Sequence, residues 1–173
     1  MRSRSRSSSQ AGYTLVEVII ALAIGALLMV ALTSVIFTAV RATSVASSQV
    51  EASAEVRNFE YYAYDDFARS SLPSAGACTQ SNPCTTQPLT LTGIQVTNTT
   101  AQPQNVTISY TWDGTSNLDR SIGGSGTSRH TATDVTAFDW YVDTNSTVVV
   151  SMTVTVGTYS ETETFRFYPR MSP

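Results

Sequence analysis

The 173-residue chain contains no lysine and only one histidine, so it has few side chains suited to catalysis. General-base and nucleophilic catalysis rely mostly on histidine, lysine, cysteine and paired carboxylates. Asp65 and Asp66 are adjacent on a predicted helix, where neighbouring side chains diverge and cannot act as a carboxylate pair. The sequence therefore argues against an enzyme, and we expect no cofactor.

Basic charge is scarce beyond the first residues. Three arginines give the first twelve residues a charge of +3, whereas the rest of the chain holds seven arginines against thirteen acids, a net −6. Binding to a phosphate backbone needs a basic face, so nucleic acid is not an expected partner. The only compact cationic pair farther along, Arg129-His130, follows the glycine-rich stretch 123–128, and we predict a solvated loop there rather than an anion site.

Cysteine is limited to Cys78 and Cys84, with five residues between them, in a loop containing proline and asparagine. This spacing favours a small disulfide-closed loop in an oxidising compartment over two free thiols. A structural zinc site needs about four nitrogen or sulfur ligands. Cys78, Cys84 and His130 are the whole supply, so no metal is expected.

No proline precedes Pro73, and the 23 residues from Val18 to Val40 carry no charge. A helix rising ~1.5 Å per residue over that length crosses the ~30 Å apolar core of a bilayer. The run is longer than the apolar region of a secretory signal, so we predict a transmembrane helix at about 18–40 that stays on the mature protein. The arginines before it place the N-terminus in the cytoplasm and the rest of the chain outside.

Glu17 lies at the start of this apolar run. An unpaired carboxylate inside a membrane costs about 2.5 to 3.5 kcal/mol on insertion scales. Two interpretations remain open from the residue alone: a charge that requires a partner, or a charge tolerated near the headgroup boundary.

The segment GYTLVE, from Gly12 to Glu17, followed by the apolar run, resembles the leader junction of type IV prepilins and pseudopilins. The resemblance implies that residues 1–12 are a leader, that prepilin peptidase cuts between Gly12 and Tyr13, and that the new amine of Tyr13 is methylated. It also implies that Glu17 pairs with the N-terminus of a neighbouring subunit during assembly. Tyr13 stands where the family usually has phenylalanine.

Helical periodicity continues beyond the apolar run, because Val56, Phe59, Ala63 and Phe67 fall on one face. We predict one long helix over 13–72, amphipathic at about 41–71 and ending near Ser71, before Pro73.

Residues 73–173 switch to a period of two, which is typical of half-buried antiparallel strands. Asp113-Gly114 suits a tight hairpin turn, and a second hairpin is expected near Gly157. The predicted fold class is α+β and pilin-like, with the long helix packed on a C-terminal antiparallel sheet domain. The apolar strand residues fall in five groups: Leu89 and Leu91; Val106 to Trp112; Leu118 to Ile122; Val135 to Val142; and Val148 to Val156, with a return through Phe165 and Phe167.

Looser features are similar to minor pilins of PilW type and to J-type pseudopilins. They are Asp66-Phe67-Ala68-Arg69, Tyr110 followed by Leu118-Asp119-Arg120, the strand with Val135, Phe138 and Tyr141, and the terminal Pro169-Arg170. Ordinary sheet packing accounts equally well for each of them.

We therefore expect a minor type IV pilin-like subunit that serves pilus assembly and, through it, adhesion, motility or DNA uptake. The expected partners are other subunits, prepilin peptidase, the inner-membrane assembly platform and membrane lipid. The protein would be a single-pass inner-membrane protein with an extracytoplasmic domain before it enters a filament. A pseudopilin of type II secretion and a membrane-anchored binding domain are the alternatives.

Overall fold

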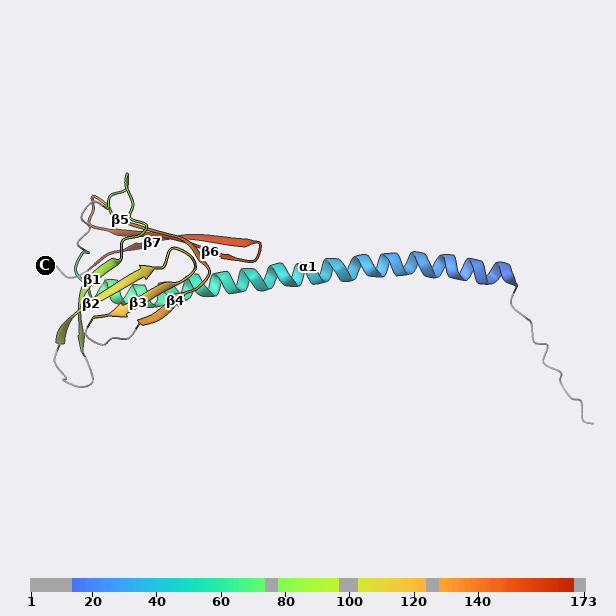
Figure 1. The fold of residues 1–173 in the computed structure, drawn as a ribbon, viewed down its shortest axis with the longest axis horizontal. Coiled ribbons are helices and arrows are strands. Elements are labelled where there is room, and N and C mark those ends of the chain that lie inside the picture. Colours follow the sequence, from blue (N-terminus) through green and yellow to red (C-terminus); the bar gives the residue numbers. More distant parts are fainter. Residues whose placement is uncertain (1–13, 74–77, 97–102, 124–127, 170–173) are drawn as a thin grey trace, which may run out of the picture. The chain divides into compact units, whose positions relative to one another are not determined.

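The computed structural model describes residues 14–73, 78–96, 103–123 and 128–169. The chain divides into two compact units, Met1–Ser44 and Val45–Pro173. The described residues form one helix and seven strands in this order (Figure 1): α1 (Leu15–Ala68), β1 (Leu89–Val96), β2 (Pro103–Trp112), β3 (Leu118–Ile122), β4 (Ser128–Ala132), β5 (Val135–Val142), β6 (Val148–Val156) and β7 (Tyr159–Phe167).

The second part of α1 buries the stripe that the sequence predicts, from Val56 to Phe67. The helix ends at Ala68, before the expected Ser71, because the next residues bond to β1 instead. The N–H of Ile94 donates to the carbonyl of Arg69 at 3.2 Å, and the N–H of Ser71 donates to the carbonyl of Thr92 at 2.9 Å. The Ser70 hydroxyl bonds to the Asp66 carbonyl, which satisfies one of the free carbonyls of the last helical turn.

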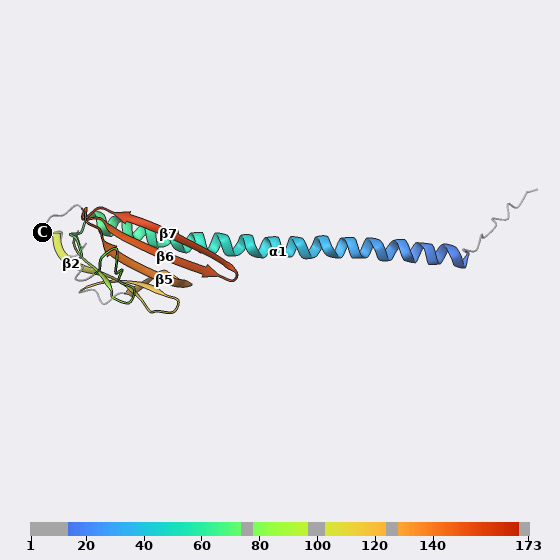
Figure 2. The same ribbon diagram turned by 90° about the horizontal axis from the view of Figure 1, so that it is seen from above.

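The strands form two antiparallel sheets in the orders β1-β2-β3-β4 and β5-β6-β7. Figure 2 shows the second sheet, with β6 between β5 and β7. Strands are present in all five predicted apolar segments and in the predicted return. The solvated loop expected at Arg129-His130 is wrong, since both residues lie in β4. Three of the five residues of β4 are exposed, so its sequence lacks the apolar alternation that reveals a strand.

Two turns differ in how they reverse the chain. The β2–β3 connection runs over residues 113–117, longer than the expected tight turn, because Asp113 Oδ1 accepts the N–H groups of Thr115, Ser116 and Asn117 at 2.7, 2.7 and 3.0 Å. These donors hold the pKa of the Asp113 carboxyl well below its usual range. In the β6–β7 hairpin, Val156 pairs with Tyr159 across a two-residue loop whose first residue, Gly157, has φ of 60°, which favours glycine.

Phe59 on α1 joins both sheets in one core. Its ring centroid lies 5.5 Å from that of Tyr110 on β2, 6.1 Å from Phe138 on β5 and 5.3 Å from Phe165 on β7. The amphipathic part of the helix therefore holds the two sheets together, as expected for an α+β fold built on one long helix.

Candidate functional site

The N-terminal end of α1 is organised by Thr14. The backbone N–H of Glu17 lies 3.3 Å from Thr14 Oγ1 and 3.0 Å from the Thr14 carbonyl oxygen. Thr14 thus caps the helix, and Glu17 occupies the third helical position, where an acidic side chain also favours the helix dipole. The Thr-x-x-Glu spacing of a capping box was visible in the sequence, but our sequence analysis missed it.

Gly12 and Tyr13, where the cleavage is predicted, lie outside the described residues.

The first part of α1 is apolar all round, and its side chains are exposed among the described residues. The segment meets the length and composition of a membrane span, and none of its most apolar window is buried. A monomer in water rarely exposes so large a continuous apolar surface, and a helix apolar on every side belongs in lipid or in a bundle. The helix therefore fits a single-pass membrane anchor.

Three hydroxyl groups along this helix are satisfied internally. Thr33, Thr38 and Thr43 donate to the carbonyls four residues earlier, at 2.8, 2.9 and 2.9 Å. In an apolar surrounding an unpaired hydroxyl is costly, and this back-bonding removes the cost. These threonines are thus compatible with a lipid environment.

A buried charge cluster fixes the C-terminal end of α1 to the first sheet. The Asp66 carboxylate accepts Arg120 Nε at 2.6 Å, Arg120 Nη2 at 2.7 Å and the Tyr110 hydroxyl at 2.5 Å. The exposed fractions of the Asp66 and Arg120 side chains are 3% and 13%. Burial, followed by the nearby Asp66 charge, raises the pKa of Tyr110 far above its usual range, so the phenol remains a donor. The hydrogen bond to Asp66 likewise raises the pKa of Arg120.

The neighbouring Asp65 faces the other way. Its carboxylate pairs with Arg69 at 2.9 Å, and both side chains are about 60% exposed. The two adjacent carboxylates therefore have separate partners, as the helical geometry predicts.

The cationic pair Arg129-His130 is engaged within the protein. Arg129 Nη1 donates to the Tyr62 hydroxyl at 2.5 Å, and its guanidinium carbon lies 5.5 Å from the centre of the Tyr62 ring. His130 Nδ1 lies 2.6 Å from Asp119 Oδ1. These contacts attach β4 to α1 and β3, and they leave no reason to assign an anion site here.

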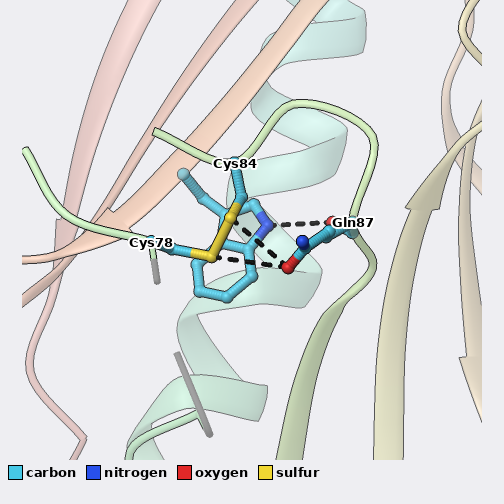
Figure 3. The surroundings of a disulfide bond; sticks show 4 residues. Cys78, Cys84 and Gln87 are labelled. Carbon is cyan, nitrogen blue, oxygen red and sulfur yellow. Dashed lines mark hydrogen bonds between the residues drawn. A yellow bond between two sulfur atoms is a disulfide. The ribbon is translucent and has the colours of Figure 1, made fainter. Parts of the chain in front are cut away.

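Cys78 and Cys84 form a disulfide with 5.2 Å between their Cα atoms. The bridged loop lies on the outer edge of β5: Cys84 and Trp140 exchange two backbone hydrogen bonds of 2.9 Å, and the N–H of Val142 donates to the Cys78 carbonyl at 3.2 Å. Figure 3 shows the side chain of Gln87 directed at the bridge, with Oε1 3.8 and 3.5 Å from the two sulfurs. The Gln87 carbonyl accepts a hydrogen bond from Trp140 Nε1 at 3.0 Å, which also attaches the chain just after the loop to β5.

Removing this bridge with Cys78→Ser and Cys84→Ser is expected to lower the free energy of unfolding by about 2 kcal/mol, the chain-entropy value for a loop of this size. Urea unfolding followed by tryptophan fluorescence measures the change, because Trp140 lies against the loop. Alkylation should add no mass to the wild-type protein until it is reduced. Two alkyl groups on the unreduced protein would show instead that the thiols are free.

Comparison with known families agrees with this arrangement. Residues 7–33 match the family model of the prokaryotic N-terminal methylation motif, and this segment includes Gly12, Tyr13 and Glu17. No curated protein and no solved structure matches the chain. The long apolar helix packed on antiparallel sheets gives the protein an α+β pilin-like architecture. It carries the prepilin-type N-terminal motif, which is consistent with a type IV pilin-like protein.

Proposed function

We propose that this protein is a minor subunit of a type IV pilus, made as a precursor and assembled into the filament through its N-terminal helix. One observation carries the proposal: the methylation motif at residues 7–33 overlaps an apolar helix whose most apolar window is unburied among the described residues. A cleaved leader explains the motif, and a bundle of like helices explains the uncovered surface. The role is structural rather than catalytic.

Processing gives the segment its chemistry. Cleavage between Gly12 and Tyr13 creates an ammonium group four residues before Glu17. In this proposal the methylated amine of one subunit pairs with Glu17 of the next, so a charge pair sets the register of apolar helices that otherwise slide freely. The partners are prepilin peptidase, the assembly platform in the inner membrane, membrane lipid and other subunits.

The proposed orientation puts the three arginines of the leader in the cytoplasm and the β-rich unit outside. The disulfide in that unit supports this orientation, because such bonds persist in oxidising compartments. From there the subunit enters the filament.

A minor rather than major role is supported by features similar to those of PilW-type and J-type subunits. The structure places three of these residues, Asp66, Tyr110 and Arg120, in one cluster. A J-type pseudopilin of a type II secretion system has the same parts. Deletion distinguishes the two, because loss of pili indicates the first and loss of exoprotein release indicates the second.

The test of processing is the mass of the N-terminal peptide from membrane-associated protein. We expect a start at methylated Tyr13, lost in a strain without prepilin peptidase and in a Gly12→Leu variant, with Ala11→Leu as the matched control. A start at Met1, or beyond Val40, would overturn the proposal and favour a membrane-anchored binding domain.

A further inference from the structure

The outer edge of β7 is the one sheet edge in the described part of the protein without a bonded neighbour. The edge of β1 is bonded by Arg69 and Ser71, and that of β5 by the disulfide loop. On β4, the Thr131 carbonyl accepts Asn58 Nδ2 at 2.8 Å. β7 pairs with β6 on one side only.

A groove of about 530 Å³ runs beside this edge, between β7 and the exposed flank of α1. Its floor is aromatic, since Phe67 and Phe167 stack there with ring centroids 4.2 Å apart. Two exposed tyrosines, Tyr64 and Tyr168, also line it. An open strand edge beside a helix, with an apolar floor, is the geometry in which an extended peptide adds to a sheet.

The charges along the groove are mostly acidic. Glu60, Glu161 and Glu163 line it together with Arg57 and Arg166, but Arg166 lies 3.9 Å from Asp143 and is partly neutralised. Glu161 accepts a hydrogen bond from Ser53. Among the described residues, Glu60, Glu163 and Arg57 have no ion-pair partner, so two unpaired carboxylates lie in the groove with one unpaired guanidinium.

This charge excludes a second copy of the same edge. Two β7 strands paired antiparallel would bring Glu161 and Glu163 of both copies onto one face, where like charges across strands are destabilising. A basic strand meets no such repulsion. Once the arginine-containing residues 1–12 are removed as a leader, the chain has a net charge of −6 and no lysine, so we take that strand from a different protein.

We propose that the groove between α1 and β7 receives an extended, basic segment of a different subunit, which adds to β7 as a new strand. Its basic side chains lie on the helix-facing side of the sheet, against Glu60 and Glu163, and the side chains between them alternate to the opposite face. This inference rests on the proposed function, because it takes the partner to be another subunit of the same filament.

The hairpin register identifies the backbone groups that the new strand would use. Across a two-residue loop the flanking pair, Val156 and Tyr159, is hydrogen-bonded, and bonded pairs then alternate along the ladder. The N–H groups of Ser160, Thr162 and Thr164 therefore point away from β6. Those of Glu161 and Glu163 point towards it.

Amide hydrogen exchange by NMR on the mature full chain in dodecyl maltoside micelles tests the proposal. The probes are two seven-residue peptides that alternate valine with arginine or valine with glutamate. We expect the arginine peptide to slow amide exchange at Ser160, Thr162 and Thr164 at least ten-fold. Exchange at Glu161 and Glu163 should change little, because their N–H groups already bond to β6. The glutamate peptide should have no effect.

Three variants then separate strand addition from charge attraction. Thr162→Pro removes one edge donor on the side away from β6, and it should weaken binding of the arginine peptide at least ten-fold, whereas the matched Thr162→Val should not. Glu163→Arg should reverse the preference between the peptides. Binding without alternating protection, or binding that Thr162→Pro leaves unchanged, would overturn the proposal. The N-terminal mass of the same preparation reports separately on processing. If Tyr13 is methylated but the peptide does not slow exchange at the β7 edge, this inference is rejected and the proposed function is not.

Discussion

Replacing Asp66 with asparagine is expected to lower the free energy of unfolding by about 3 kcal/mol, because it leaves Arg120 charged and unpaired at 13% side-chain exposure. The change also weakens the hydrogen bond that Asp66 accepts from Tyr110. Urea unfolding of the full chain in detergent measures the effect. Both tryptophans, Trp112 and Trp140, lie in the unit Val45–Pro173, so their fluorescence reports on it.

The adjacent residue supplies the matched control for this prediction. Asp65→Asn removes an exposed pair with Arg69 and should cost less than about 1 kcal/mol. Arg120→Met alone should also destabilise, and combining it with Asp66→Asn should cost less than the sum of the two single changes, because no unpaired charge then remains. Equal effects of Asp65→Asn and Asp66→Asn would contradict a buried pair that holds α1 to the sheet.

Replacing Glu17 with alanine is expected to reduce incorporation into filaments by about a hundred-fold while leaving cleavage intact. In the assembled bundle the methylated amine of the neighbouring subunit loses its counter-charge, and an unpaired charge in apolar surroundings costs about 2.5 to 3.5 kcal/mol. The variant anchor itself remains apolar and should stay in the membrane. Immunoblots of sheared filaments against membrane fractions, normalised to mature protein, measure the ratio.

Two other variants separate charge pairing from helix capping. Thr14→Ala removes the side-chain cap, worth about 1 kcal/mol, and should change incorporation little. Val16→Ala controls for the loss of apolar volume at this end of the helix. If Glu17→Ala assembles as well as the wild type, the Glu17 carboxylate makes no pair with a neighbouring subunit. Its role is then confined to the first turn of its own helix, where the Glu17 N–H also bonds to Thr14.

Features that depend on local periodicity were predictable from the sequence. The apolar run is too long for anything but a membrane-spanning helix, and the stripe through Phe59 and Phe67 repeats at a helical spacing. The alternation in β6, whose inward residues from Val148 to Val154 are buried, likewise indicates a strand. The α+β part of the predicted fold class rested on these signals and its pilin-like part on the resemblance of the segment from Gly12 to Glu17 to prepilins, and the fold class is confirmed.

Features that depend on distant pairing were not predictable in this way. Asp66, Tyr110 and Arg120 were all noted, but they meet only because β2 and β3 pair in a register that sets Tyr110 opposite Arg120 and brings both to the helix. The strand β4 is polar and is held by contacts with α1 and β3, so its own sequence carries little signal. The predicted end of α1 was too far along the chain for a related reason. The Arg69 carbonyl accepts a hydrogen bond from Ile94 of β1, so the helix ends before it reaches Pro73.

The disulfide loop has a consequence for stoichiometry. It occupies the outer edge of β5 through the paired backbones of Cys84 and Trp140, so in the described part of the chain the sheet β5-β6-β7 is closed at β5 and open at β7. A sheet with two open edges can be bridged on both sides and can propagate as a ribbon. This sheet offers one site for strand addition, so each chain takes up a single strand there and terminates a β-mediated assembly rather than extending it.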